Sequence, residues 1–408
     1  MKYKPLIHLK FQTLALLFLC LLTATVSAEE QTGWKLHTID NTSRGADGVK
    51  LADINEDGLL DIATGWEEGG VIRLYLQPPL AERKNPWPMV TVGKVNSPED
   101  AFFADANLDG QLDLISCCEG KTRTVYAHLA PGKDQLLQES LWKTVPLAAS
   151  AEQTCWMFGL GADLDQDPYH ELFCGSKEPG GRIGYFDPNS TSVENSRWVP
   201  VRSAGWIMSL FLCDVEGDGD LDLVYSDRKG KETGCWFLEN PGDGTPVESW
   251  KRIAIGGQHR EVMFLSNCQI NNRQAFVAAV REREVHVFIE RGQTPLRFET
   301  WAFTLPASGG TAKAAALVDL DESGTLDLVV SCENAQNKHG VFVMHNTLAA
   351  EGGFARVAGR FETISGVELG IKYDRFELLD LDEDGDLDLL TCEERDNLGV
   401  IWYENPLK

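Results

Sequence analysis

The sequence predicts an all-β protein, a seven-bladed β-propeller of four-stranded blades whose N-terminal strand closes the ring by joining the last blade. Three observations lead to this prediction. An acidic nonapeptide recurs about every 50–60 residues, an aromatic residue recurs with the same period, and short apolar runs of strand length fill the intervals. Long repeats that each hold four short strands are typical of propellers, whereas a parallel β-helix has much shorter repeats.

The acidic repeat has the spacing D-x-[DN]-x-[DN]-G-x-x-D and defines six units. Positions one, three, five and nine are occupied, copy by copy, by Asp53, Asn55, Asp57 and Asp61; Asp105, Asn107, Asp109 and Asp113; Asp163, Asp165, Asp167 and Glu171; Asp214, Glu216, Asp218 and Asp222; Asp319, Asp321, Ser323 and Asp327; Asp380, Asp382, Asp384 and Asp388. The interval before Asp319 is doubled. A seventh copy that has lost its acids fits in the gap, with Asn267, Gln269, Asn271 and Ala275 at the four positions.

The recurring aromatic residue marks the outer strand of each unit. It is Trp34, Trp87, Trp142, Trp198, Trp250, Trp301 and finally Phe361. The chain begins with such a strand before any acidic loop and ends after a third strand at Val400–Tyr403. Inner and outer strands therefore balance only if residues 34–39 complete the last blade, which also removes an open sheet edge. We expect the aromatic residues to pack as core between blades.

The spacing of the acidic repeat predicts calcium sites. Alternate residues of a tight loop point inward, glycine at position six permits the sharp turn, and Ca²⁺ takes six to eight hard oxygen ligands. Clustered carboxylates repel one another unless a cation neutralises them, while zinc favours His or Cys ligands. We expect five Ca²⁺ sites, and a sixth at Asp163–Glu171 that Pro168 disfavours, because proline cannot take a positive φ. The acid-free copy should bind no metal, and a solvated acidic turn is the alternative for the others.

These loops resemble those of the FG-GAP/VCBS repeat family, whose propeller is similar to the integrin α-subunit head. The closest local match is Phe158-Gly159, then Asp163 to Glu171, then Gly175 to Pro179, and the resemblance covers nearly all of the chain after residue 28. It implies structural calcium in the loops between first and second strands. It implies no single activity, because the family includes adhesins, exported proteins and modules attached to enzymes. A few polysaccharide lyases and sugar dehydratases also have similar propellers.

Residues 1–28 predict a cleaved signal peptide, followed by a single propeller over residues 29–408. Three lysines (Lys2, Lys4 and Lys10) precede an apolar core at Phe11 to Leu22, and Val26-Ser27-Ala28 is a small-residue cleavage site. The apolar core is short for a transmembrane anchor, although an uncleaved anchor is the alternative. We therefore expect a secreted or periplasmic protein without a transmembrane segment.

The cysteines follow the repeat. Of the nine that remain after residue 28, five lie just after the acidic loops: Cys117, Cys118, Cys174, Cys332 and Cys392. Equivalent positions in a repeat indicate equivalent packing, so we interpret them as small buried hydrophobic residues. One or two disulfides remain open in an oxidising compartment.

Composition limits the partners of the chain. Its 408 residues contain 62 acidic and 37 basic side chains, a net charge of -25, which argues against nucleic acid and anionic membranes. We expect a monomer that binds an extracellular glycan or protein at the mouth of the central channel, on the face opposite the acidic loops. The candidates are two tryptophans able to stack on sugars and a set of cationic side chains able to hold carboxylates: Trp156, Trp206, His259, Arg260, Arg281, Arg283 and Arg375.

Simpler interpretations of these residues remain. Polar loop residues are commonly just solvated, and the tryptophans would equally well plug the channel. No nucleophile elbow, phosphate-binding loop, zinc helix or cofactor fingerprint is present, so we predict a non-catalytic protein. The alternative is a polysaccharide lyase or sugar dehydratase with its site in the central funnel, which would need a base such as His259 or Tyr373.

Overall fold

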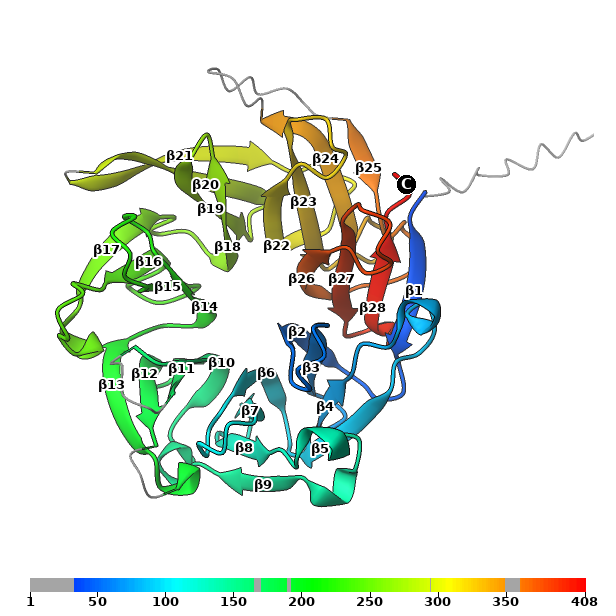
Figure 1. Cartoon of the computed structure of the whole chain (residues 1–408). Helices are drawn as coiled ribbons and strands as arrows, with labels where there is room; N and C mark the ends of the chain where they lie inside the picture. Colours follow the sequence, from blue (N-terminus) through cyan, green and yellow to red (C-terminus); the bar gives the residue numbers. More distant parts are fainter. Residues whose placement is uncertain (1–32, 165–169, 189–191, 294, 349–359) are drawn as a thin grey trace, which may run out of the picture. The chain divides into compact units, whose positions relative to one another are not determined.

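The computed structural model describes residues 33–164, 170–188, 192–293, 295–348 and 360–408. Within residues 33–408 the strands form seven four-stranded antiparallel sheets, and Figure 1 shows these sheets arranged as blades around a central axis. The predicted seven-bladed propeller is therefore confirmed. The signal peptide predicted at residues 1–28 lies outside the described residues.

Four consecutive strands form each of the first six blades. Blade one contains β2 (Ala46–Ala52), β3 (Asp61–Trp66), β4 (Val71–Tyr75) and β5 (Met89–Lys94); blade two β6 (Pro98–Ala104), β7 (Asp113–Cys118), β8 (Val125–Leu129) and β9 (Lys143–Pro146); blade three β10 (Cys155–Ala162), β11 (Glu171–Lys177), β12 (Arg182–Asp187) and β13 (Arg197–Ser203). Blade four contains β14 (Ile207–Cys213), β15 (Asp222–Asp227), β16 (Gly234–Glu239) and β17 (Lys251–Gly256); blade five β18 (Val262–Ile270), β19 (Arg273–Val280), β20 (Glu284–Gln293) and β21 (Leu296–Thr304); blade six β22 (Thr311–Val318), β23 (Leu326–Glu333), β24 (Val341–Leu348) and β25 (Phe361–Thr363). Short 3₁₀ helices lie in the described connections: η1 (Leu80–Glu82), η2 (Lys133–Gln135), η3 (Glu139–Leu141), η4 (Ala148–Ser150), η5 (Val193–Asn195) and η6 (Val247–Ser249).

Blade seven combines the two ends of the described chain. Its strands are β26 (Tyr373–Leu379), β27 (Asp388–Glu393), β28 (Gly399–Glu404) and, outermost, β1 (Lys35–Asp40). β1 pairs antiparallel with β28, so that Leu36 lies opposite Tyr403. Ile39 and Trp402 then pack in one core cluster with Trp66 of blade one. The predicted closure by residues 34–39 is confirmed. β1 completes blade seven by pairing with β28, and the shared core cluster joins blade seven to blade one.

The packing of the blades explains the sequence pattern. The second strands β3, β7, β15 and β27 are buried at every position, because each sheet is covered on both faces by neighbouring blades. The repeated aromatic residue lies at the outer strand, and Trp87, Trp142 and Trp250 are buried there. Each of these three indole N–H groups donates to a backbone carbonyl of the preceding connection. The prediction that they are core aromatics is thus confirmed.

Two further predictions concern cysteines and membranes. The nine cysteines in the described residues are free thiols, and the five that follow the acidic loops are fully buried. They are small core residues, as predicted, and the disulfides left open do not form among them. The described part of the chain contains no helix with the length and apolarity needed to cross a bilayer.

Candidate functional site

The acidic loops connect each inner strand to the second strand, and their ninth residue anchors them. Asp61 is fully buried, and its carboxylate accepts the Ile54 amide at 3.2 Å and the Gln77 amide at 2.9 Å. The same two amide contacts recur at Asp113, Asp222 and Asp388. The ninth residue therefore ties the loop to the end of the third strand of its own blade.

The first residue of the loop sets the turn. Asp53 accepts the amides of Asp57 and Gly58 at 3.0 and 2.8 Å, and the copy in blade seven is alike. The glycine at position six has a positive φ, 89° at Gly58 and 96° at Gly385, as expected for a sharp turn. Position four is also left-handed although it is Glu56 in blade one and Glu383 in blade seven. Glutamate carries no signal for that conformation, so the sequence did not predict it.

The loops fit a divalent cation. Asp105, Asp319 and Asp382 each have a buried carboxylate oxygen without a hydrogen-bond partner among the described residues. In blade seven, oxygens of Asp380, Asp382 and Asp388 lie within 4.8 Å of one another. Such hard, unpartnered donors match the oxygen ligands of calcium.

Burial makes the ninth carboxylate costly to ionise. It raises the pKa of Asp113 and Asp388 to about 7 and that of Asp61 to about 6, with smaller contributions from the neighbouring acids of each loop. A bound dication would offset this penalty by supplying the missing positive charge.

Two copies of the repeat differ from the rest. In blade five a two-residue turn at Asn271 and Asn272, both with positive φ, replaces the loop, as in a type I′ hairpin. Asn267 and Gln269 lie in the strand ladder, opposite Phe276 and Gln274, so the side chains aligned with the acids do not surround one point. In blade three Glu171 accepts the Leu164 amide at 2.9 Å, whereas Asp165, Asp167 and Pro168 lie outside the described residues.

The opposite end of the channel contains a polar pocket of about 430 Å³. Every inner strand begins at this mouth and runs toward the end of the channel at which the acidic loops lie, so the first residues of the inner strands line the pocket. All seven blades contribute through these strands or the ends of the second strands: Asp47 and Glu67, Glu99 and Glu119, Phe158 and Lys177, Trp206 and Arg228, Phe264, Lys313 and Glu333, Asp374 and Glu394. The face predicted to bind a ligand, opposite the acidic loops, therefore contains a pocket.

Most cations of the mouth are paired with acids of a neighbouring blade. Lys313 of β22 and Asp374 of β26 are 5% and 2% exposed, and their charged atoms lie 3.0 Å apart. Lys50 of β2 lies 3.2 Å from Asp100 of β6 and donates to the Gly159 carbonyl at 3.0 Å. Further pairs join Lys177 to Glu119 and Lys372 to Glu394. The first three pairs connect neighbouring blades at the mouth, whereas Lys372 and Glu394 both belong to blade seven.

The remaining acids concentrate on one side of the pocket. Carboxylate oxygens of Asp47, Glu67 and Glu99 lie within 4.8 Å of one another. Burial and the adjacent charge of Asp374 raise the pKa of Asp47 well above its usual value, and the two carboxyl groups share a hydrogen bond. Burial also opposes ionisation of Asp374, but the Lys313 ammonium outweighs it and lowers the pKa of Asp374. The pKa values of these two neighbouring carboxyl groups are thus displaced in opposite directions.

An aromatic constriction closes the floor of the mouth. The rings of Phe158 and Phe264 lie 6.3 Å apart, and the Lys50 ammonium lies 3.7 Å from the centre of the Phe158 ring. Both rings also line a second cavity of about 500 Å³, whose other walls include Leu210 and Leu378. The channel thus has an upper chamber with a charged lining and a lower chamber whose lining residues are mostly apolar in type.

Only two of the predicted ligand residues, Trp206 and Arg375, line the pocket. Trp156 was predicted wrongly: it is 1% exposed, packs against Phe186 and Trp198, and donates its indole N–H to the Ser150 carbonyl. A core tryptophan of this kind cannot stack on a sugar.

The cluster predicted around His259 is dispersed. His259 and Arg260 border a separate shallow depression. Arg281 pairs with Glu333 at 2.8 Å, and Arg283 donates to the carbonyls of Leu305 and Pro306. The guanidinium groups are therefore engaged in holding loops, which is a correction to the predicted ligand site.

Trp206 is itself covered by cations of this chain. Lys177, Arg228 and Lys229 lie 4.5, 4.3 and 4.7 Å from its ring centre.

The sequence prediction missed Asp47 and Phe264 as pocket residues. Their only signal was their place at or near the start of an inner strand, which is shared with many residues that do not face the channel.

Comparisons with known proteins bear on the fold. No protein-family model matches the chain, and no curated protein matches it. Among solved structures it is similar to BBS1N, crystallised in complex with ARL6DN and soaked with lead, with a TM-score of 0.52 and 12% identity over 91% of this chain and 97% of that chain. It is likewise similar to the Cps50 (Swd1) β-propeller domain of Myceliophteria thermophila, with a TM-score of 0.52 and 12% identity over 90% and 98% of the two chains. The likeness shows the propeller fold. At this identity it shows nothing further.

Proposed function

We propose that the protein is a secreted, calcium-stabilised member of the FG-GAP/VCBS propellers that binds an extracellular partner at the channel mouth and catalyses no reaction. The observation that carries this proposal is the polar pocket to which all seven blades contribute. Its charged side chains come from strands and short loops that a closed ring holds rigidly, which is how binding residues are commonly presented. A solved structure with the same fold is a complex with a protein partner, in keeping with such a role.

The charge of the pocket indicates the chemistry of the partner. Acidic residues in its lining outnumber basic ones nine to six, and the basic ones are largely paired. Three of the acids, Asp47, Glu67 and Glu99, form one group, and burial raises the pKa of each, so that a bound cation would favour their ionised form. We therefore favour a protein that inserts a lysine or arginine side chain, with a glycan carrying an amino group as the other partner of matching charge.

Calcium belongs to the same proposal. The amide-anchored acids and the buried oxygens without partners support five Ca²⁺ sites, at Asp53–Asp61, Asp105–Asp113, Asp214–Asp222, Asp319–Asp327 and Asp380–Asp388. Bound calcium would supply positive charge that fastens each loop to its blade. Because the loops lie at the opposite end of the channel from the pocket, we assign calcium a structural role.

Binding is tested with lysine-containing peptides and amino-sugar oligosaccharides on an array, followed by fluorescence polarisation. The double variant Glu67→Gln/Glu99→Gln should weaken binding of the cationic probes about tenfold or more, since it removes two acidic groups that a bound cation would hold in the ionised form. Glu282→Gln removes a charge from an exposed residue outside the pocket lining and is the control. Equal binding by wild type and the double variant would show that the pocket is not the binding site.

A specific observation also favours an enzyme as the second candidate. Asp47 and Asp374 face the pocket with pKa values displaced in opposite directions, the pattern expected of an acid and a base acting together. Neither base suggested by the sequence fits: Tyr373 is fully buried and bonded to Leu369 and Tyr403, and His259 lies outside the pocket.

The enzymatic alternative is tested by turnover. Wild type and Asp47→Asn are assayed against a panel of uronic-acid polysaccharides. Turnover by wild type that Asp47→Asn abolishes would establish a lyase or related enzyme and replace the binding function. Lack of turnover on the panel, together with binding of the cationic probes, would support the non-catalytic role.

A further inference from the structure

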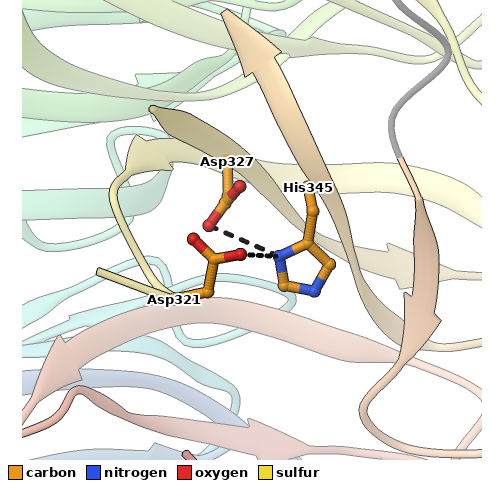
Figure 2. A group of neighbouring side chains, drawn as sticks. All are labelled: Asp321, Asp327 and His345. Carbon is orange, nitrogen blue, oxygen red and sulfur yellow. Dashed lines mark ion pairs between the residues drawn. The ribbon is translucent and has the colours of Figure 1, made fainter. Parts of the chain in front are cut away.

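The acidic loop of blade six has a histidine neighbour. Figure 2 shows His345 of β24 directed at Asp321 and Asp327 of this loop. The imidazole is only 4% exposed as a residue, and its Nδ1 lies 3.5 Å from one oxygen of each aspartate. The three ligand atoms all lie within 4.8 Å of one another. A nitrogen donor thus joins a loop whose repeat pattern supplies only oxygen.

The surroundings of the imidazole fix its orientation. Its Nε2 lies 3.1 Å from Glu362, and Glu362 is in turn held by the Trp34 indole at 3.0 Å and by Arg360 at 2.9 Å. When Nε2–H donates to this carboxylate, the Nδ1 lone pair faces Asp321 and Asp327. A histidine that ligates a metal typically donates its other ring N–H to a carboxylate in this way.

Two buried atoms at this loop lack hydrogen bonds. Within the part of the chain that the structure describes, neither Nδ1 of His345 nor one oxygen of Asp319 has a hydrogen-bond partner. The 3.5 Å separations from Nδ1 are longer than a hydrogen bond. Nδ1 thus has two ion-pair contacts but no hydrogen bond, and a metal ion held by His345, Asp321 and Asp327 would satisfy it.

Comparison with the other blades sets this loop apart. By strand register, His345 lies on the third strand opposite Asp327, the ninth loop residue. In the other blades that have an acidic loop, the corresponding residues are Leu76, Leu129, Asp187, Glu239 and Glu404. Position five of the same loop is Ser323 instead of aspartate, and its hydroxyl is bonded to Thr325 at 2.7 Å. Blade six has therefore lost one carboxylate and gained one imidazole.

We propose that this loop binds a first-row transition-metal dication, best matched by zinc, through Nδ1 of His345 and carboxylate oxygens of Asp321 and Asp327. Imidazole with carboxylates is a zinc donor set, whereas calcium takes oxygen. Ligands of a tetrahedral ion at 2.0–2.1 Å lie about 3.3–3.4 Å apart, close to the observed 3.5 Å. A water molecule completes the shell.

The site has a structural role. It joins the third strand of blade six to the acidic loop, and Glu362 extends the connection to Trp34, which immediately precedes the ring-closing strand β1. The proposal does not depend on the function of the channel mouth. It replaces calcium by zinc at one of the five predicted sites, Asp319–Asp327, and leaves the other four unchanged.

The test is selective metal retention by the full chain. Protein loaded with Zn²⁺ is dialysed against excess Ca²⁺, and bound metals are measured by mass spectrometry. Wild type should retain one Zn²⁺ per chain and His345→Leu none, because leucine occupies the corresponding position in blades one and two and keeps the fold. Glu362→Gln should lower zinc affinity about 10–100-fold. Asp384→Ala, in the loop of blade seven, should retain the zinc.

Cobalt provides a second readout. Co²⁺ bound by wild type should give the intense visible absorption of a tetrahedral ion, and His345→Leu should lack it. Equal zinc retention by wild type and His345→Leu, or complete replacement of zinc by calcium in wild type, would overturn the proposal. So would a wild type that retains no zinc, because His345 would then be only an ion-pair partner of the two aspartates. Binding of the cationic probes at the mouth is measured on the same variants and should not change.

Discussion

One buried carboxylate, Glu393 at the end of β27, should be among the most sensitive positions of the channel mouth. It is fully buried, and it accepts backbone amides from both loops that flank it. Oε1 accepts the amides of Ile371, Lys372, Arg395 and Asp396 at 3.1, 3.0, 2.9 and 3.0 Å, and Oε2 accepts that of Leu398 at 3.3 Å. A single side chain thus organises the backbone on which Lys372 and Glu394 of the pocket depend.

The expected loss of stability on substitution follows from the five amide hydrogen bonds that Glu393 accepts. Hydrogen bonds to a charged group contribute about 1.5–3 kcal/mol each, but they are not additive, and loop amides regain water when the acceptor is removed. We therefore expect Glu393→Ala to lower the free energy of unfolding by about 3–5 kcal/mol, the range found when one partner is removed from a buried charged pair. Glu393→Gln keeps one acceptor oxygen and should cost about half as much.

Blade four supplies a matched control. Asp227 holds the same position at the end of β15 and accepts the amides of Gly205 and Trp206 at 2.9 and 2.8 Å. With fewer donors to leave unsatisfied, Asp227→Ala should be less destabilising than Glu393→Ala. Urea unfolding followed by tryptophan fluorescence and circular dichroism measures both. A change under about 1 kcal/mol at Glu393, or a larger effect at Asp227, would refute the reasoning that amide count sets the cost.

The remaining predictions concern metal, pH and ring closure. Chelation of Ca²⁺ should lower the melting temperature; Asp384→Ala or Asp218→Ala should reduce this response, and Asn271→Ala should leave it intact. Burial lowers the pKa of His128 to about 3, so the unfolded chain binds an extra proton as pH falls below about 6.5. The contribution of His128 to the free energy of unfolding should therefore decline by up to about 1.4 kcal/mol per pH unit as the pH falls from about 6.5 to 3. His128→Gln should make the free energy of unfolding from urea titrations depend less steeply on pH in this range. Ile39→Ala should cost about 2–4 kcal/mol because it empties the core that joins blade seven to blade one; no change in the urea midpoint would mean that β1 does not close the ring.

Much of the fold was predictable because its determinants are local and repeated. The period of the acidic loops and aromatic residues predicted seven blades, and the phase of the two chain ends predicted that residues 34–39 join the last blade. The glycine at position six had to be left-handed for the loop to turn, and it is. Each of these features depends on residues within one blade or on simple counting along the chain.

The site was less predictable because its residues come from different blades. Strand periodicity places a side chain on one face of a sheet, but it does not tell whether that face meets the channel or the next blade. Trp156 and Phe158 lie two residues apart in β10, yet the first is core and the second lines the channel. A bulge between them, which shifts the strand register, contributes to this outcome and has no sequence signal of its own.

The sequence by itself determined the blade, the number of blades and the acidic loops, because neighbouring residues and their spacing encode them. Only the tertiary structure decided which charges meet: Asp47, Lys313 and Asp374 come from blades one, six and seven, and His345 reaches its loop from another strand. The physical reason is that ring closure brings together residues far apart in the chain. These residues become buried and form their ion pairs only when the ring has closed.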